Sequence, residues 1–198
     1  MKVVLADYGA GNTRSVCAAL SRAGAEPVVS TAPDEVREAP LVVIAGVGHV
    51  ASAARGLIPL EEALRGRADA GRPILGICVG LQLLFEENEE GGRGLGLLGG
   101  PVRRLRARRI PHMGWNAIRP VRESRLLDGL DDADVYFAHS YAAQPDDSRV
   151  TVATVDHGGP IVAAVESAHL AGVQFHPERS GSVGGRILEN LVQWSRSG

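Results

Sequence analysis

The sequence predicts an α/β fold: an open, mostly parallel sheet flanked by helices, with an antiparallel extension in the second half of the chain. Residues 41–45 are apolar throughout, which is typical of a strand buried on both faces of a parallel sheet. Segments with apolar residues at helical spacing, such as Val16 and Leu20, separate the strands of the first half. In the second half, residues 151–155 and 161–165 flank an Asp-His-Gly-Gly turn and predict a β-hairpin.

The length and composition predict one globular domain. A chain of 198 residues can form one sizeable core, so we expect a single domain over residues 1–198. A hydrophobic fraction of 44% with 22% charged residues excludes the disordered and membrane classes. The formal net charge is −2 and only 4% of the residues are aromatic, so neither charge nor stacking surfaces favour nucleic acid as a partner.

The cysteines and the N-terminus predict a cytoplasmic protein. Cys17 and Cys78 lie far apart in the sequence and have no metal-type spacing, which favours a reducing compartment and no bound metal. The apolar run before Asp7 covers only residues 3–6, which is too short for a signal peptide. We therefore expect neither export nor a membrane partner.

The remaining elements follow from local pattern. Strands are expected at residues 3–6, 26–30, 41–45, 74–77, 135–138 and 171–175. Helices are expected through residues 16–23, where Gly24 ends the helix, at residues 34–37 and at residues 60–70. The acidic residues 86–92 are interpreted as a solvated helix end, the arginine-rich residues 103–109 as a basic strand and loop that serve a partner protein or an anionic substrate, and residues 111–116 as a loop. His157 and His169 lie on predicted turns and are expected to be exposed to solvent.

Two glycine loops follow predicted strands. Residues 7–12 read Asp-Tyr-Gly-Ala-Gly-Asn, and residues 46–49 read Gly-Val-Gly-His. The first loop lacks the third glycine of a phosphate-binding loop and the second lacks a following lysine, so a dinucleotide site is excluded. Ligands of open α/β sheets bind beyond the carboxyl ends of the strands, so both loops and residues 78–80 should converge on one crevice.

A cysteine stands on a sharp turn between a predicted strand and a predicted helix. Residues 73–85 read P-I-L-G-I-C-V-G-L-Q-L-L-F, and the spacing Gly76-x-Cys78-x-Gly80 is the thiol version of a nucleophile elbow. Glycines flank the nucleophile because this turn brings backbone close to backbone. The thiol should point into solvent at the end of the sheet, above a helix N-terminus that offers free N–H groups to an oxyanion. A single free cysteine can equally be a small buried apolar residue, so this pattern alone leaves both interpretations open.

A histidine and a glutamate follow the last predicted strand. Residues two apart in an extended segment share a side, so His176 and Glu178 can face the same way, and Pro177 favours an extended backbone at the histidine. A carboxylate beside one imidazole nitrogen fixes the tautomer and leaves the other nitrogen to act on a nucleophile. A surface pair is the default for His-x-Glu alone. Together with the cysteine elbow, the pair predicts a Cys78, His176, Glu178 triad.

These residues resemble the class I glutamine amidotransferases, and the resemblance covers most of the chain. It implies that Cys78 attacks the side-chain amide of glutamine, that His176 is general base and then acid, and that Glu178 orients it. The resemblance also implies oxyanion donors at Val47, Gly48 and Val79. It implies no cofactor. The positions that would hold glutamine are Gly48, Gln82, Glu90, His139, Ser140 and Tyr141.

Within this family the sequence is most similar to the glutaminase subunits of imidazole glycerol phosphate synthases, which serve histidine biosynthesis. The most discriminating block is Pro-His-Met-Gly-Trp-Asn at residues 111–116, supported by Gln-Phe-His-Pro-Glu at residues 174–178. The resemblance implies a (β/α)8 cyclase subunit as heterodimer partner, to which ammonia passes without reaching bulk water. The partner interface would include Asn12, Met113, Trp115, Tyr136 and Arg179.

Four positions depart from the family pattern. Ala45 stands where proline usually precedes Gly-Val-Gly, so a freer backbone there could alter the basal activity. The elbow carries Val79 and Leu81, which are apolar exchanges of little consequence. Arg179 replaces a common lysine, which keeps the charge and changes the contact geometry.

Three alternatives remain at the level of the sequence. A cysteine hydrolase of similar elbow architecture would not need Gln82 or the 111–116 block. A non-enzymatic interaction subunit would not need all three triad residues. The third alternative lies within the amidotransferases: the chain would be the glutaminase subunit for pyridoxal phosphate or anthranilate synthesis.

Overall fold

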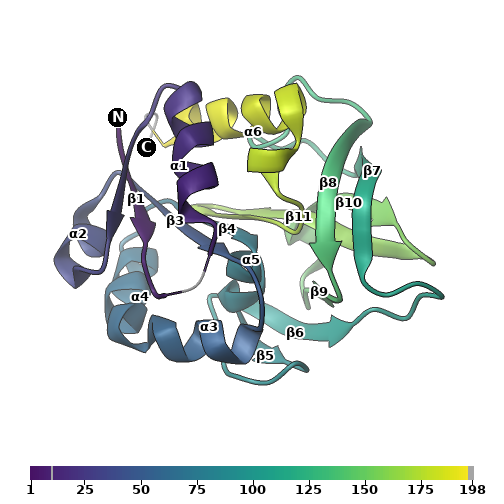
Figure 1. Ribbon diagram of the computed structural model, residues 1–198, viewed down its shortest axis with the longest axis horizontal. Helices are drawn as coiled ribbons and strands as arrows, with labels where there is room; N and C mark the ends of the chain where they lie inside the picture. Colours follow the sequence, from purple (N-terminus) through teal and green to yellow (C-terminus); the bar gives the residue numbers. More distant parts are fainter. Residues whose placement is uncertain (10, 196–198) are drawn as a thin grey trace.

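The structure is a computed structural model that describes residues 1–9 and 11–195 (Figure 1). Ala10, within the predicted turn at residues 7–12, and residues 196–198 lie outside the described part. A single nine-stranded sheet runs through the molecule in the order β2-β1-β3-β4-β12-β11-β10-β7-β8. The strands in this order are Glu26–Ser30, Lys2–Ala6, Leu41–Gly46, Ile74–Cys78, Leu170–Val173, Pro160–Ser167, Thr151–Asp156, His112–Pro120 and Ala133–His139.

The sheet changes direction at β12. The neighbouring strands from β2 to β12 pair in parallel, and those from β12 to β8 pair antiparallel. The parallel half is connected through helices, whereas β10 and β11 form the hairpin that the turn residues predict. The predicted fold class, a parallel sheet with an antiparallel extension, is confirmed.

Helices cover both faces of the parallel half (Figure 1). Helices α1 (Thr13–Arg22) and α6 (Gly181–Trp194) pack together over one face. On the other face lie α2 (Pro33–Glu38), α3 (Val50–Leu57), α4 (Glu61–Asp69) and α5 (Val79–Leu84). Short 3-10 turns occupy Ile58–Leu60, Ser148–Val150 and Pro177–Arg179. Among the described residues, none of these helices is long and apolar enough to cross a bilayer.

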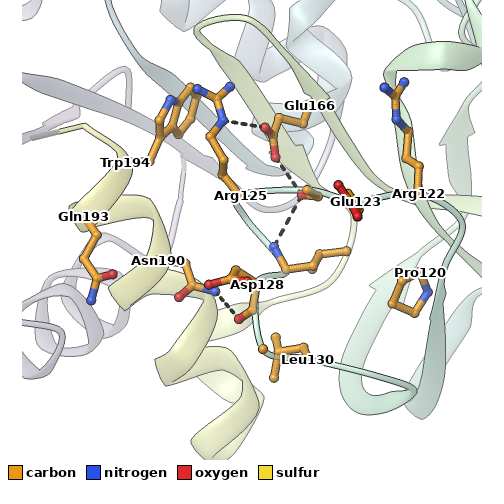
Figure 2. A pocket seen from close by; sticks show the side chains of 13 residues that line it. Pro120, Arg122, Glu123, Arg125, Asp128, Leu130, Glu166, Asn190, Gln193 and Trp194 are labelled. Atoms are coloured by element: carbon orange, nitrogen blue, oxygen red, sulfur yellow. Dashed lines mark hydrogen bonds and ion pairs between the residues drawn. The ribbon is translucent and has the colours of Figure 1, made fainter. Parts of the chain in front are cut away.

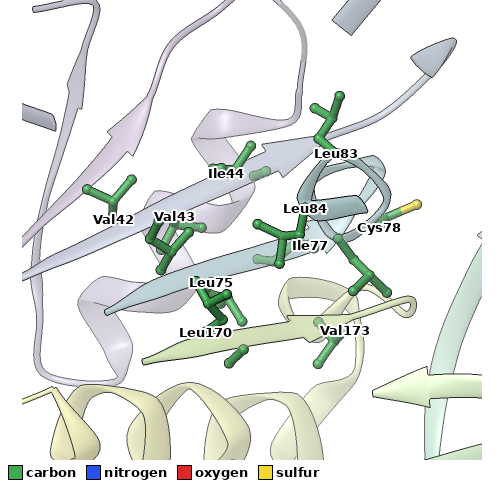
Figure 3. Close-up of a cluster of buried hydrophobic side chains, with 14 of the residues drawn as sticks. Val42, Val43, Ile44, Leu75, Ile77, Cys78, Leu83, Leu84, Leu170 and Val173 are labelled. Carbon is green, nitrogen blue, oxygen red and sulfur yellow. The ribbon is translucent and has the colours of Figure 1, made fainter. Parts of the chain in front are cut away.

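A cluster of buried apolar side chains lies where β3, β4 and β12 run side by side next to α5 (Figure 3). Ile44, Leu75 and Val173 are completely buried, as are their neighbours on these strands. The Cys78 side chain stands just beyond this cluster, at the end of β4. The core therefore fixes the strand ends from which the loops and the thiol emerge.

The acidic segment and the helix before α4 differ from the prediction. Phe85–Asn88 forms strand β5, which pairs with β6 (Leu98–Arg104), and β6 pairs with β9 (Tyr141–Ala143) in a second, three-stranded sheet. The interpretation of residues 86–92 as a helix end is therefore wrong. Helix α3 was not predicted, and the helix expected at residues 60–70 begins as a 3-10 turn. Val50, Ala53 and Leu57 are buried at helical spacing, so the sequence carried a helical signal here that the prediction overlooked.

Residues 111–116 are also not a loop, because most of the block belongs to strand β7. Its residues alternate between two faces, so His112 is buried whereas Met113 and Trp115 are exposed. A glycine between two large apolar residues hid this alternation. The two turn histidines are not fully exposed either: His157 stacks on His112 at 4.2 Å between ring centroids, and His169 is half-buried.

Gly80 gives a direct test of this packing. A Cβ at Gly80 would collide with the carbonyl oxygen of Ile44, which is backbone and cannot move aside, so Gly80→Ala is expected to lower the free energy of unfolding by about 1–3 kcal/mol or more. Gly66 is an exposed position of helix α4 with nothing within 4 Å of an added Cβ, so Gly66→Ala should raise the free energy of unfolding by about 0.5–1 kcal/mol. Urea unfolding of both variants measures the contrast, and equal effects would contradict the packing described.

Candidate active site

A cavity of about 340 Å³ lies at the carboxyl ends of β3 and β4. The glycine loops and the elbow converge on it as predicted, because β3 and β4 pair with Gly46 opposite Cys78. The lining includes all three predicted triad residues, all the predicted glutamine-binding residues and three of the predicted interface residues. Its members are Asn12, Val47, Gly48, Cys78, Val79, Gln82, Glu90, Pro111, Met113, Ala138, His139, Ser140, Tyr141, His176, Glu178 and Arg179.

Cys78 occupies a strained turn between β4 and α5. Its φ of 54° and ψ of −105° are unusual for a residue with a side chain, and such a conformation costs on the order of 1–3 kcal/mol. The surrounding β4, β3 and α5 packing holds it there. The side chain is only 3% exposed, so the expectation that the thiol points into open solvent is wrong. It faces the cavity instead, with Gln174 Nε2 at 3.6 Å from Sγ.

His176 and Glu178 form a buried pair. His176 Nδ1 lies 2.9 Å from Glu178 Oε1, and the two side chains are 5% and 2% exposed. A carboxylate only accepts hydrogen bonds, so Nδ1 carries a proton. The shared side that the sequence predicted does not come from an extended segment, because Pro177–Arg179 is a 3-10 turn that folds Glu178 back onto the imidazole.

The charges around His176 favour its protonated form. Burial lowers the pKa of the imidazole, but the hydrogen bonds with Cys78 and Glu178 and the negative charge of both groups outweigh this and raise the pKa to about 10. The contacts with Glu178 and Cys78 therefore favour a protonated imidazole. This arrangement can supply a proton to a leaving amine.

The backbone of His176 is clamped to β8. Its N–H donates to the carbonyl of Tyr136 at 2.9 Å, and the Ser180 hydroxyl donates to the His176 carbonyl at 2.6 Å. The same hydroxyl accepts the N–H of Tyr136 at 3.0 Å. Ser180 therefore joins the triad turn to the strand that carries the predicted interface residue Tyr136.

Tyr8 supports the loop that was predicted to contribute oxyanion donors. Its hydroxyl is buried and donates to the carbonyl of Ala45 at 2.8 Å. Burial and the nearby Cys78 both raise the pKa of Tyr8, so it stays a neutral donor. A Cβ at Gly46 would lie 2.5 Å from this hydroxyl, so the chain can pass between Tyr8 and Val79 only as glycine. Val47 and Gly48 follow at the exposed rim.

The predicted glutamine-binding residues are held in different ways. Glu90 Oε2 accepts the N–H of Val50 at 2.8 Å, so this carboxylate caps the start of α3 as well as lining the cavity. Gln82 is buried and donates to the carbonyl of Tyr141 at 3.0 Å. Ser140 and Tyr141 are half-buried at the wall.

A row of hydrogen-bonded histidines runs from β7 to the cavity wall. His139 Nδ1 lies 2.8 Å from the Tyr141 carbonyl, so this nitrogen must be the donor, and His139 Nε2 must then accept from His112 Nδ1 at 3.0 Å. That leaves His112 Nε2 to accept from Asn116 Nδ2 at 3.2 Å. One carbonyl therefore fixes both tautomers.

Both histidines of this row are neutral. Burial, joined by the charge of His157, lowers the pKa of His112 to about 4. Burial also lowers the pKa of His139 to about 3, where the Tyr141 hydrogen bond opposes it and the neighbouring imidazoles add to it.

The predicted interface residues gather on the outer face of β7 and β8. Met113 and Trp115 are 65% and 58% exposed. Trp115 meets the ring of Tyr136 edge-on at 6.2 Å between centroids, and the Arg179 guanidinium lies 4.5 Å from the Tyr136 centroid. Asn12 is exposed at the cavity rim. Exposed apolar and cationic side chains thus lie beside the cavity.

A larger cavity of about 990 Å³ lies elsewhere and shares no lining residue with the first (Figure 2). Its polar side chains hold the loop between β7 and β8 in place. Glu166 binds Ser124 and Arg125, Asn190 donates to the carbonyls of Leu126 and Asp128, and Arg125 stacks over the Trp194 ring. These contacts are structural.

Sequence reasoning missed three residues at the site: Tyr8, Gln174 and Ser180. Gln174 carried a signal, because a polar residue between Val173 and Phe175 in a buried strand must find a hydrogen-bond partner. Tyr8 and Ser180 carried none, since the Ala45 carbonyl and the Tyr136 N–H that they bind lie 37 and 44 residues away along the chain.

Comparisons with known proteins agree with this geometry. Residues 4–194 match the family Glutamine amidotransferase class-I. The chain belongs to this family. It is 46% identical to the imidazole glycerol phosphate synthase subunit HisH of Zymomonas mobilis, over 98% of this chain and 96% of that protein. It is 42% identical to the HisH subunit of Natronomonas pharaonis, over 98% and 94%. The predicted resemblance to these subunits is confirmed.

A solved structure, PurLQS from Thermotoga maritima, is similar with a TM-score of 0.79 and 21% identity, covering 98% of each chain. At that identity the likeness concerns the fold alone. The chain is thus a glutamine amidotransferase of the class-I family. Among residues 1–9 and 11–195, no group of three or more His, Cys, Asp or Glu side chains is arranged to hold a metal ion.

The row formed by His112 and His139 makes the stability of the fold depend on pH. The folded pKa values of His112 and His139 lie below the usual 6.5, so below pH 6.5 the unfolded chain binds more protons and acidification favours unfolding. Their contribution is complete above pH 6.5 and is lost toward pH 4. Each histidine should lower Tm by about 3–6 °C per pH unit in this window.

Thermal melting of His112→Gln between pH 7.5 and pH 4.5 tests this. The glutamine amide can still donate to His139, and the fall of Tm with pH should become clearly shallower because one titrating group is gone. Ile58→Gln is the control, since that side chain is 63% exposed and neither residue titrates, so the slope should stay unchanged. An unaltered slope in His112→Gln would show that the row does not titrate as described.

Proposed function

We propose that this chain is the glutaminase subunit of an imidazole glycerol phosphate synthase. It hydrolyses glutamine to glutamate and ammonia, and a (β/α)8 cyclase subunit uses the ammonia to make imidazole glycerol phosphate and aminoimidazole carboxamide ribotide in histidine biosynthesis. The observation that carries the proposal is the buried His176 and Glu178 pair beside Cys78, in a cavity lined by Gln82 and Tyr141. The identity to HisH subunits over nearly the whole chain supports the choice of partner reaction.

The proposed reaction uses the three residues in turn. Cys78 Sγ attacks the side-chain carbonyl carbon of glutamine, and the N–H of Val79 with donors from the Val47 and Gly48 segment stabilises the oxyanion. The C–N bond breaks as the leaving nitrogen takes a proton from the His176 imidazolium, and ammonia and a thioester result. Water then loses a proton to His176 and attacks the thioester. The C–S bond breaks, glutamate leaves, and the sulfur and imidazolium return to their starting state.

The remaining glutamine-binding assignments follow from position on the wall. Gln82, Glu90, His139, Ser140 and Tyr141 line the cavity around the sulfur. His139 is neutral and so places no positive charge against the substrate. We assign the α-carboxylate and α-amine of glutamine to this wall.

The partner surface is proposed on the outer face of β7 and β8. Met113 and Trp115 offer large exposed apolar side chains, and aromatic residues of this kind are typical interface anchors. Tyr136, Arg179 and Asn12 border the same surface. A cyclase seated here would cover the mouth of the cavity, so ammonia could pass directly between the subunits. We place this complex in the cytoplasm.

The central experiment measures glutamate release from glutamine by the chain alone and with candidate cyclase subunits, with and without the nucleotide acceptor. Stimulation by the histidine-pathway cyclase is expected. Stimulation only by a synthase subunit for pyridoxal phosphate or anthranilate would move the assignment to that pathway.

Cys78→Ala should reduce glutamate release on the order of a thousand-fold or more, because no other group can form the thioester. The matched control is Cys17→Ala, which changes the half-buried cysteine of α1 and should retain activity. Parent-like release by the Cys78→Ala enzyme would refute the mechanism.

Trp115→Ala should weaken the complex with the cyclase by about 30-fold or more, as expected when a buried interface anchor is truncated. Titration of the cyclase while glutamate release is followed gives the apparent Kd. Val28→Ala, on the opposite edge strand β2, is the control and should bind like the parent. An unchanged Kd in Trp115→Ala would remove this residue from the interface.

A further inference from the structure

Gln174 is a buried polar residue with no role in the reaction described so far. It follows β12, whose Val173 pairs with Ile77 of β4, so its side chain emerges beside Cys78 at the same end of the sheet. It is 0% exposed. A primary amide in such a place must be hydrogen-bonded, because an unpaired buried amide is costly.

The Gln174 amide lies between Gln82 and the sulfur. Its Oε1 is 3.2 Å from Gln82 Nε2, and its own Nε2 is 3.6 Å from Cys78 Sγ. The same Gln82 Nε2 is 3.0 Å from the carbonyl oxygen of Tyr141. A short chain of contacts therefore connects a backbone carbonyl to the nucleophile.

The carbonyl of Tyr141 determines the direction of every bond in this chain. A carbonyl oxygen only accepts, so the Gln82 NH2 must face it, and the second N–H of that group points to Gln174. Reversing the Gln174 amide would place its NH2 group against the NH2 group of Gln82, so that two donors would face each other. The orientation that avoids this clash presents an N–H, not a carbonyl oxygen, to Sγ.

We propose that Gln174 is a further catalytic residue, whose side-chain N–H donates to Cys78 Sγ and stabilises the thiolate, with Gln82 as the positioning residue that orients it. The inference rests on the proposed glutaminase function, because it deepens the role of the same nucleophile. A hydrogen bond to an ionised acceptor is about twice as strong as a neutral one, and both Gln174 and Cys78 are buried here. The Ala138 carbonyl, 4.0 Å from the sulfur, can accept only from the neutral thiol and so cannot stabilise the thiolate.

The donor would act at two points of the cycle. Before attack it holds the sulfur charge together with the His176 imidazolium on another side. When the thioester is hydrolysed, the sulfur leaves as an anion and the same N–H receives it. Gln82, which the family resemblance assigns to the substrate, would thus also orient a group that touches the nucleophile.

The test measures the reactivity of the thiol directly. Iodoacetamide alkylation of Cys78 is followed from pH 4 to pH 10 in a Cys17→Ser background, so that only one thiol reacts. Gln174→Met keeps the length of the side chain and removes the donor, and Gln174→Glu replaces the donor with an acceptor. The midpoint of the rate profile should rise by about one to two pH units in both, as expected for loss of a bond to a charged group. One unit corresponds to about tenfold slower alkylation near pH 7.

Two controls separate this role from general damage. Gln144→Glu adds the same charge at an exposed position outside the cavity and should leave the midpoint unchanged. Gln82→Met, which removes the group that orients Gln174, should raise the midpoint by a smaller amount, and it replaces Gln174→Met if that variant does not fold. Circular dichroism and thermal melting establish which variants are folded.

A folded Gln174→Met or Gln82→Met protein with the parental midpoint would overturn the inference. That result would leave the proposed function standing if glutamine were still hydrolysed. Conversely, a raised midpoint in the variants, together with a parent protein that hydrolyses no glutamine with or without a cyclase, would support the donor and refute the function.

Discussion

The active site depends on the parallel, in-register pairing of three neighbouring strands. β3, β4 and β12 end at the same edge of the sheet, with Gly46 opposite Cys78 and Val173 opposite Ile77. The glycine loop at residues 46–49 follows β3, and the proposed nucleophile Cys78 ends β4. The segment with Gln174 and the His176–Glu178 pair follows β12. Their apolar side chains pack against α5 and hold the strand ends in place (Figure 3). The strain at Cys78 is tolerable because this packing fixes both sides of the turn.

The polar groups of the site are ordered by a single backbone carbonyl. The carbonyl oxygen of Tyr141 accepts from Gln82 and from His139. Each of these bonds fixes which of the other polar atoms of that side chain donate and which accept. One branch reaches the sulfur, and the other reaches β7. Because a buried polar group without a partner is costly, both branches are fixed in direction as well as in position. The site is therefore preorganised by hydrogen-bond polarity as much as by shape.

Much of the fold and of the candidate site could be predicted from the sequence, for local reasons. Buried parallel strands are apolar throughout, and a glycine-flanked cysteine after such a strand predicts a sharp turn, so residues 41–45 and 74–80 were placed correctly. The cavity brings together the residues that this pattern and the family resemblance identified.

The errors arose where long-range contacts decide the structure. His112 pairs with His139 on a strand that a glycine disguised, and Glu178 reaches His176 through a 3-10 turn that the extended pattern did not indicate. Tyr8 meets Ala45 only because β1 and β3 are neighbours in the sheet. The local sequence pattern indicates none of these contacts.

Strands β7 and β8 carry both the proposed partner surface and the histidine row. Alternation sends Met113 and Trp115 outward and His112 and Asn116 inward, so the surface offered to a partner and the histidine row are opposite faces of one ribbon. The carbonyl of Tyr136 on this ribbon accepts the N–H of His176. A protein seated on the outer face would therefore rest on the backbone that holds His176, and any shift of β8 on docking would be transmitted to the imidazole through one hydrogen bond and through Ser180.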